Sequence, residues 1–470
     1  MPIKIAIPKE IAANETRVAA SPETVKKLIS LGARVFVEKD AGIKADILDS
    51  DYKDAGASIA KSAAEAYKSA DIVLKVQAPS DSEIKLLQKA TLLVAMLSPY
   101  SNTGLVEKLA KAGVNACSME LVPRITRAQS MDVLSSQSNL AGYKSVLDAC
   151  EHFGRALPMM MTAAGTVPPA KVFVMGAGVA GLQAIATGRR LGGVVSATDV
   201  RPAAKEQVES LGASFVAVEN EEFKEAETAG GYAKEMSKDY QKEQQALIED
   251  TIAKQDIVIT TALIPGRPAP KLISEKMVKS MKAGSVIVDL AVETGGNCAL
   301  SEAGKVVTKH GVTIIGHHNV PGRLAANASA LYAKNLLNFV SLVISNEKKK
   351  IDLNLEDEII AGVLLTKDGE VIHPNFAKAP AKKPATKKAS AKKAKSAKAA
   401  PKKTTTKKTT TKKTTTKKTT TKKTTTKPEA AKKTTAKKAA PKKTVSKKAS
   451  TAKKSSSAKP KAKTTTKKDT

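Results

Sequence analysis

The stretch Lys171-Val-Phe-Val-Met-Gly-Ala-Gly-Val-Ala-Gly-Leu-Gln183 decides the fold of this chain. Its first five residues have the length of a strand and are apolar after Lys171. Helical spacing begins among the glycines, which therefore lie at a strand-to-helix turn. Gly176 permits the tight turn, Gly178 lets the backbone approach a pyrophosphate, and Gly181 allows the helix to pack closely on the sheet. The stretch predicts a dinucleotide-binding α/β unit whose helix amino terminus faces the phosphates.

An acidic residue follows the next predicted strand, residues 194–198. Asp199 stands where a carboxylate accepts hydrogen bonds from ribose hydroxyls and repels a 2′-phosphate. Arg201, a nearby basic residue, would favour NADP(H). Asp199 nevertheless occupies the position that distinguishes the two cofactors, so we expect NAD(H) and not NADP(H). A tight turn without a ligand is the alternative for a glycine pattern alone, and the flanking strand, helix and acid argue against it.

Strand-like and helix-like segments alternate along most of the chain, which indicates parallel sheets with helices on both faces. The predicted strands lie at residues 4–7, 33–38, 71–77, 91–97, 114–119, 171–175, 194–198, 215–218, 256–261, 285–290 and 312–315. The predicted helices include residues 80–89, 103–112, 134–153 and 326–345, and a hairpin over 364–372 turns at Asp368-Gly369. A further helix begins after Ser21, with Pro22 in its first turn, and stops at Gly32.

This order predicts an α/β fold of two Rossmann-like, doubly wound domains with a cleft between them. We expect a discontinuous amino-terminal domain of residues 1–135 and 327–376, and an NAD-binding Rossmann domain of residues 136–326. The last 94 residues, 377–470, have a different composition and form a third region.

The net positive charge of the chain comes entirely from that third region. Residues 377–470 hold 35 lysines and two acids, which gives all of the net charge of +33, while the remainder has 43 basic and 43 acidic residues. A Lys-Lys-Thr-Thr-Thr period runs from Lys402 to Lys423, and such a segment lacks the apolar surface that folding needs. We expect a disordered tail that is either a solvated extension or a salt-sensitive contact to nucleic acid or an anionic membrane surface.

The cysteines and apolar runs limit the class of protein. Cys117, Cys150 and Cys298 have no paired or metal-like spacing, which favours a reducing compartment. No apolar run reaches the roughly 18 residues that span a bilayer, so any membrane span would come from other chains. His317 and His318 are adjacent and point to opposite faces of an extended segment, so no metal site is expected.

A second motif carries a family resemblance. The run Glu120-Leu-Val-Pro-Arg-Ile-Thr-Arg-Ala-Gln-Ser-Met-Asp-Val-Leu-Ser-Ser-Gln-Ser-Asn139 resembles the signature of the NAD(H)-binding component of proton-translocating transhydrogenases. The resemblance covers essentially all of residues 1–376 and includes Gly230-Gly-Tyr-Ala233 and Thr261-Ala-Leu-Ile-Pro-Gly266. It implies direct hydride transfer between NADH on this chain and NADP⁺ on a partner subunit, coupled to proton translocation.

The resemblance also implies partners and site residues. It implies a homodimer on the inner, cytoplasmic face of a membrane, active only with membrane-spanning and NADP(H)-binding subunits. Gln129 would bridge towards the NADP(H) ribose, Arg124 and Asp132 would hold the carboxamide and orient each other, and Ser135 would lie beside them. Tyr232 would lie on a mobile loop that closes over the nucleotide. The remaining cofactor-binding positions are Val179, Ala180, Val200, Gly231, Ala262 and Leu263.

The chemistry of hydride transfer agrees with this set. Hydride passes directly between two nicotinamide rings, so the protein needs no acid/base pair and has only to position the rings and exclude water. The alternative for Arg124 and Asp132 is an ordinary surface ion pair in a loop.

Two other functions compete with this interpretation. Arg17 and Lys75 resemble substrate-pocket residues of the related alanine dehydrogenases, but Ser98-Pro99-Tyr100 stands where such an enzyme would carry a histidine, and Glu293 stands where it would carry an aspartate. We therefore interpret Arg17 and Lys75 as structural groups. The other alternative is an NAD-binding protein whose tail binds nucleic acid.

Overall fold

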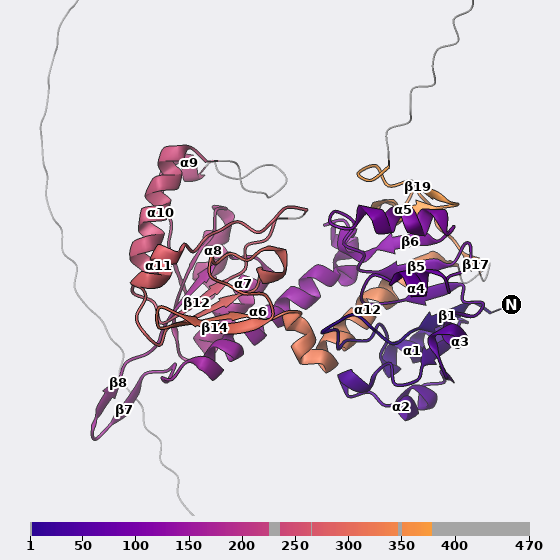
Figure 1. The fold of residues 1–470 in the computed structure, drawn as a ribbon, viewed down its shortest axis with the longest axis horizontal. Coiled ribbons are helices and arrows are strands. Elements are labelled where there is room, and N and C mark those ends of the chain that lie inside the picture. The colour runs from indigo at the N-terminus through magenta and orange to yellow at the C-terminus, as the bar shows by residue number, and fades with distance from the viewer. Residues whose placement is uncertain (1, 225–235, 265, 346–349, 378–470) are drawn as a thin grey trace, which may run out of the picture. The chain divides into compact units, whose positions relative to one another are not determined.

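A computed structural model describes residues 2–224, 236–264, 266–345 and 350–377, and most of its strands form two sheets (Figure 1). The first sheet has the order β19-β18-β6-β5-β4-β1-β2-β3 and the second the order β11-β10-β9-β12-β13-β15-β14. The strands of the first sheet are β1 (Lys4–Ile7), β2 (Arg34–Glu38), β3 (Ser58–Ala60), β4 (Ile72–Leu74), β5 (Leu92–Ala95), β6 (Asn115–Ser118), β18 (Leu364–Lys367) and β19 (Glu370–Val371). Those of the second are β9 (Lys171–Met175), β10 (Val194–Thr198), β11 (Ser214–Phe215), β12 (Ile257–Thr260), β13 (Val286–Asp289), β14 (Lys305–Lys309) and β15 (Val312–Gly316).

Helices connect these strands. The α-helices are α1 (Pro22–Ser30), α2 (Asp49–Asp54), α3 (Ala63–Tyr67), α4 (Asp81–Ile84), α5 (Thr103–Lys111), α6 (Val133–His152), α7 (Val179–Arg190), α8 (Ala203–Ser210), α9 (Glu221–Lys224), α10 (Lys238–Ile252), α11 (Glu275–Ser280), α12 (Ala325–Val343) and α13 (Glu358–Val363). The 3-10 helices are η1 (Ile43–Ala45), η2 (Met119–Leu121), η3 (Thr126–Met131), η4 (Val292–Thr294) and η5 (Val320–Leu324). Two small hairpins complete the fold, β7 (Met160–Thr162) with β8 (Gly165–Val167) and β16 (Ile344–Ser345) with β17 (Lys350–Ile351).

Both faces of each sheet are buried, as the apolar runs predict. In β1, Ile5 and Ile7 pack with α1 and α12 on one face, and Ala6 packs with α5 on the other. In β9, Val172 packs with α6 and α7, and Phe173 packs with α10 and α11. Successive side chains of a strand alternate between faces, so apolar residues at every position require helices on both sides. The α/β, doubly wound fold class is confirmed.

Segments that are distant from the other strands in the sequence complete the first sheet. Strand β18 pairs with β6, and α12 supplies buried side chains to the same core as β1. The predicted hairpin is present, with β18 and β19 antiparallel around Asp368-Gly369, where both residues have positive φ. The exact domain boundaries given above remain predictions.

Several elements differ from the sequence prediction. The sheets are mixed, because β18 runs antiparallel to β6 and β14 antiparallel to β15. A two-residue turn, His310-Gly311, with positive φ at both residues, closes the latter hairpin. The helix expected over residues 80–89 is one turn long, and turns follow it. Strands β3 and β14 were not predicted, because both lie at sheet edges and carry exposed side chains.

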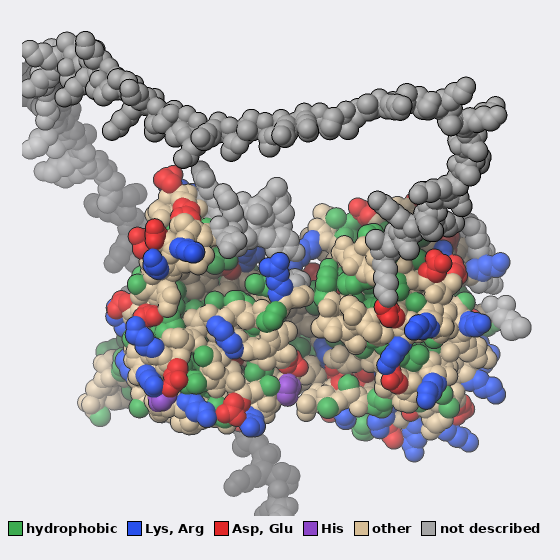
Figure 2. Space-filling view, turned by 45° about the horizontal axis from the view of Figure 1, so that its top comes forward, with side chains coloured by type: hydrophobic (Ala, Val, Ile, Leu, Met, Phe, Trp, Pro, Cys, Tyr) green, Lys and Arg blue, Asp and Glu red, His purple; other side chains and the backbone are tan. Residues whose placement is uncertain are grey.

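The charged side chains of the folded region are mixed. Figure 2 shows Lys and Arg interspersed with Asp and Glu over the visible face, in agreement with the formal neutrality of residues 1–376. The tail predicted to be disordered lies outside the described residues from residue 378 onward. Among the described residues, no helix is long and apolar enough to cross a membrane.

Candidate nucleotide-binding site

The glycine turn joins the end of β9 to the start of α7. Gly176 has a φ of +103°, and a side chain there would lie 2.6 Å from the hydroxyl of Thr261, which donates to the Gly176 carbonyl at 2.9 Å. A Cβ on Gly181 would lie only 1.8 Å from the same carbonyl. Folding itself therefore requires glycine at both positions.

Gly178 is different from its two neighbours in the motif. Its φ is −76°, and a Cβ built on it would meet no heavy atom within 4 Å. Neither backbone strain nor packing in the folded chain requires glycine here. The space in front of Gly178 lies at the amino terminus of α7, where no side chain caps the helix. An uncapped helix amino terminus beside open space can accept a phosphate.

Helix α6 packs against this turn. Gly142 of α6 lies so close to α7 that a Cβ on it would be 2.0 Å from the carbonyl oxygen of Ala180. Asp132 caps the amino terminus of the same helix: its carboxylate accepts the backbone N–H of Ser135 at 2.8 Å and the Ser135 hydroxyl at 2.6 Å. Ten residues of helix separate Asp132 from Gly142, a rise of about 15 Å. One rigid element therefore connects the glycine turn to the signature run.

The carboxylate of Asp199 follows β10 and is nearly buried. It accepts the backbone N–H of Ala177 at 2.7 Å, the backbone N–H of Arg201 at 2.9 Å, and two guanidinium N–H groups of Arg201 at 2.9 and 3.0 Å. A carboxylate has about four lone-pair sites, and these bonds occupy them. Ribose hydroxyls could bond to Asp199 once the Arg201 side chain, which is 32% exposed, moves aside.

Apolar side chains surround the turn. Val179, Val200 and Leu263 are all exposed. The loop after β12 is held by Asn297, whose buried amide donates to the Ala262 carbonyl at 2.9 Å and accepts the Ala262 N–H at 3.0 Å. Sequence reasoning did not single out Asn297 or Thr261 as supports, because both act through backbone groups far away in sequence.

The signature run forms η3 and the start of α6. Arg124 and Gln129 have exposed side chains, and Asp132 and Ser135 are half-buried and bonded to each other. The expected mutual orientation of Arg124 and Asp132 stays a prediction. Gly231 and Tyr232 lie within residues 225–235, outside the described residues.

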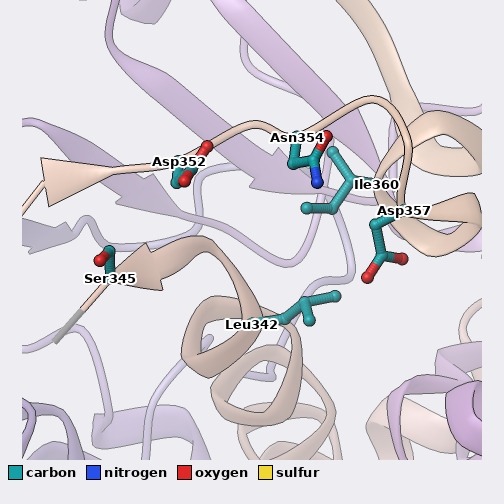
Figure 3. A pocket seen from close by; sticks show the side chains of 6 residues that line it. All are labelled: Leu342, Ser345, Asp352, Asn354, Asp357 and Ile360. Carbon is teal, nitrogen blue, oxygen red and sulfur yellow. The ribbon is translucent and has the colours of Figure 1, made fainter. Parts of the chain in front are cut away.

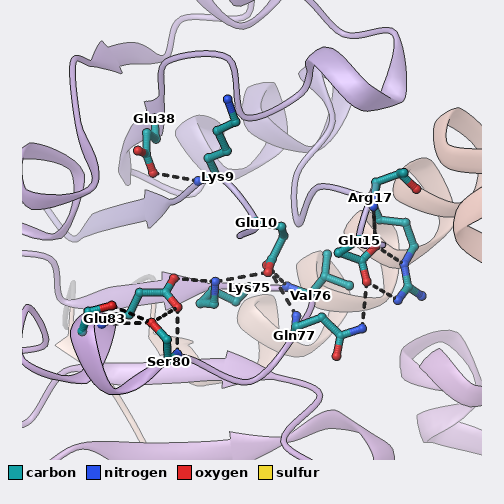
Figure 4. Close-up of polar contacts among 12 residues, drawn as sticks. Lys9, Glu10, Glu15, Arg17, Glu38, Lys75, Val76, Gln77, Ser80 and Glu83 are labelled. Carbon is teal, nitrogen blue, oxygen red and sulfur yellow. Dashed lines mark hydrogen bonds and ion pairs between the residues drawn. The ribbon is translucent and has the colours of Figure 1, made fainter. Parts of the chain in front are cut away.

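Arg17 belongs to a buried polar network (Figure 4). Its guanidinium donates to both carboxylate oxygens of Glu15, at 2.8 and 2.7 Å, and to the Gln137 side chain at 2.9 Å. Burial alone would raise the pKa of Glu15, but the bonds and charge of Arg17 outweigh it and lower that pKa to about 2. The stabilisation from this pair is complete above the ordinary carboxyl pKa and is lost as the pH falls from there towards 2.

Lys75 lies in the same region of the network. Its ammonium donates to Glu83 at 2.7 Å and to Glu10 at 3.2 Å, and all three side chains are nearly inaccessible. Burial raises the pKa of Glu10, whereas for Glu83 burial is outweighed by the charge of Lys75, which lowers the pKa. The Lys75 ammonium and two nitrogens of the Arg17 guanidinium thus donate to carboxylates of the chain itself. The third Arg17 nitrogen donates to the amide oxygen of Gln137.

Comparison with known proteins places this geometry in a family. The amino-terminal domain model of the alanine dehydrogenase/PNT family matches residues 6–141, and its carboxy-terminal domain model matches residues 145–374. The first portion of the NAD(P) transhydrogenase alpha subunit of Rhodospirillum rubrum is 57% identical over 377 residues, which cover 79% of this chain and 98% of that protein. The chain belongs to the NAD(P) transhydrogenase alpha-subunit family.

Solved structures agree with this family. The crystal structure of transhydrogenase from Sinorhizobium meliloti has a TM-score of 0.72 and 56% identity, and the match covers 78% of this chain and all of that one. The alanine dehydrogenase of Staphylococcus haemolyticus is only 30% identical over 80% of this chain and 96% of its own. The much higher identity to transhydrogenase alpha subunits decides between the two activities that the shared family model allows.

Two positions at which this sequence departs from the alanine dehydrogenases can be located in the structure. The backbone N–H of Ser98, where those enzymes were expected to carry a histidine, bonds to the carboxylate of Glu120. Glu293 is exposed and lies 3.5 Å from the ring of His318. Among the described residues, no three His, Cys, Asp or Glu side chains are grouped to hold a metal ion.

Proposed function

We propose that this transhydrogenase alpha subunit binds NADH and NAD⁺ at the glycine turn and exchanges hydride with NADP(H) on a partner subunit. The observation that carries the proposal is Gly178, where the folded chain leaves room for a Cβ, whereas the close approach of a pyrophosphate would require glycine. The uncapped amino terminus of α7 would hold the pyrophosphate, together with the backbone at Val179, Ala180 and Gly181.

The remaining cofactor contacts follow from the elements around the turn. Asp199 would bind the adenosine ribose after Arg201 releases it, and the acid would repel the 2′-phosphate of NADP(H). Val200, Ala262 and Leu263 would provide apolar surface for the adenine end. Residues Gly231 and Tyr232 are proposed to cover the nucleotide on the strength of the family resemblance alone.

The nicotinamide end would lie at the signature run. Bound NADH supplies the hydride, so the chain has only to orient the ring and keep water away. We assign orientation of the carboxamide to Arg124, Asp132 and Ser135, and contact with the NADP(H)-binding partner to Gln129. Helix α6 supports this arrangement because Asp132 caps its amino terminus and Gly142, further along it, packs on the glycine turn.

The test is hydride exchange with the purified chain. We expect NADH to reduce an NAD analogue only when both a recombinant NADP(H)-binding transhydrogenase component and NADP(H) are present. Alanine with NAD⁺ is the parallel control, for which we expect no NADH formation. Exchange without the partner component, or alanine oxidation by the chain alone, would contradict the proposal.

We further propose that the chain works as a homodimer through the β7–β8 hairpin, which projects from the second sheet (Figure 1). Every side chain of β7 is exposed, and Met161 is 79% exposed with Met159 and Met160 beside it. A two-stranded hairpin without a packing partner is marginally stable, and contiguous exposed apolar residues mark interaction sites. A second copy is the occupant that we propose, in agreement with the family resemblance.

Met161→Asp should convert the dimer to a monomer, because a charge would replace the most exposed apolar side chain of the hairpin. Multi-angle light scattering during gel filtration measures the mass. Ile43→Asp, which changes a 48% exposed isoleucine in η1, is the matched control and should remain dimeric. Equal masses for both variants and the unmodified chain would exclude the hairpin as the dimer contact.

The membrane partners and the tail complete the proposal. We propose that the chain lies at the inner face of a membrane against membrane-spanning subunits, and that residues 377–470 strengthen this attachment. Their 35 lysines would be attracted to anionic lipid headgroups, with an effect that weakens as salt increases. Retention by DNA and not by anionic vesicles would instead favour the nucleic-acid alternative.

A further inference from the structure

The 3-10 helix η3 has three distinct sides. A 3-10 helix has three residues per turn, so side chains at positions i and i+3 lie above one another. Ala128 and Met131 form the first pair, and both are buried in the core of the first sheet. Thr126 and Gln129 form the second pair, and both are exposed. Arg127 lies on the third side, together with Ser130.

Two groups of η3, the Arg127 side chain and the Ser130 backbone carbonyl, bond to segments more than 200 residues later in the sequence. The guanidinium of Arg127 donates two parallel hydrogen bonds, each of 2.7 Å, to the two carboxylate oxygens of Asp357. The carbonyl of Ser130 accepts the side-chain amides of Asn335 and Asn338 of α12, at 2.8 and 3.0 Å. Arg127 and Ser130 both lie within one turn of Gln129, and the Gln129 side chain takes part in neither contact and is exposed.

Asp357 is itself held in place by α13. Its carboxylate accepts the backbone N–H of Ile359 at 2.9 Å and so caps α13, and its side chain is only 18% exposed. The hydrogen bonds from Arg127 hold the pKa of Asp357 below its usual value. Asp357 also lines a pocket of about 220 Å³ with Leu342 and Asn354, as Figure 3 shows. The position of the Asp357 carboxylate is therefore set by the amino terminus of α13 and does not depend on Arg127.

We propose that Arg127 is a positioning residue for hydride transfer, which it supports by fixing η3 to Asp357 so that Gln129 faces the partner-bound nucleotide. This inference rests on the proposed function. Bidentate guanidinium–carboxylate pairs fix direction as well as distance, and lysine cannot reproduce them. Since the pair touches neither the glycine turn nor Asp199, its loss should leave NADH binding intact while misplacing the reacting groups.

Arg127→Ala is expected to lower the turnover number of hydride exchange about tenfold, because a misplacement of about 1 Å can slow such a reaction by up to about 100-fold. The Kd of the chain for NADH, measured by fluorescence titration without the partner, should change less than twofold. Arg127→Lys should recover only some of the rate, and Asp357→Asn should resemble Arg127→Ala. This split between rate and binding is a result that a purely structural role would not give.

Arg155→Ala is the matched control. Arg155 is 52% exposed and pairs with the nearly buried Asp256 at 2.9 Å, much as Arg127 is 49% exposed and pairs with Asp357. It should exchange hydride at the unmodified rate. Unmodified exchange by Arg127→Ala, or a loss explained entirely by weaker NADH binding, would overturn the inference. Inactivity of the unmodified chain with its partner would instead count against the proposed function.

Discussion

Gly178→Ala is expected to weaken NADH binding about 10- to 100-fold. The Tm of the free chain should differ from that of the unmodified chain by no more than about 1–2 °C, because a neutral surface substitution changes the free energy of unfolding by about 0.5 kcal/mol or less. The added methyl group meets no heavy atom of the protein within 4 Å, so the free protein can accept it. It would project into the space that the pyrophosphate is proposed to fill. An extra methyl in a closely packed contact costs about 1–3 kcal/mol, which corresponds to this range of affinity.

Gly181→Ala provides the contrast within the same motif. Its Cβ would lie 1.8 Å from the Gly176 carbonyl, so the turn itself must distort. We expect a Tm lower by at least about 5 °C together with loss of binding. Calorimetry and NADH titration on both variants separate the two effects. Equal NADH affinity in Gly178→Ala and the unmodified chain would place the pyrophosphate elsewhere.

The strand-to-helix turn could be predicted because its causes are local. The glycines, the apolar strand before them and the acid at Asp199 are all set by residues within about 30 positions, and the predicted bounds of β9 and β10 are those observed. The antiparallel turn at Asp368-Gly369 was predictable for the same reason. Short-range signals of this kind depend on backbone preferences and side-chain periodicity.

Contacts between distant segments could not be predicted from the same signals. The attachment of Arg127 to Asp357 joins residues 230 positions apart. Asn297 supports the loop at Ala262 from another strand end. Each of these depends on which elements meet in the folded chain, and a single sequence does not contain that information.

Lys75→Met is expected to destabilise the chain by about 3–5 kcal/mol, because it leaves two buried carboxylates without their cation. Glu10 and Glu83 both bond to the Lys75 ammonium, and Tyr67 donates a further bond to Glu83 at 3.1 Å. Without Lys75 the pKa of Glu10, which burial already raises, should rise further, and the pKa of Glu83 should rise above its unfolded value. Stability that is lost at neutral pH should then return to some extent as the pH falls and the carboxylates become protonated.

Thermal unfolding of Lys75→Met between pH 5 and 8 measures this loss. The triple variant Lys75→Met, Glu10→Gln, Glu83→Gln should recover much of it because no buried carboxylate is then left without its cation. Lys27→Met is the control: Lys27 and Glu23 form an exposed pair at 2.9 Å, and exposed pairs contribute little to stability. A Lys75→Met variant as stable as the Lys27→Met control would mean that the buried network does not depend on the ammonium. Lys75 would then be available to a ligand, as in the alanine dehydrogenases, and its interpretation as a structural group would be wrong.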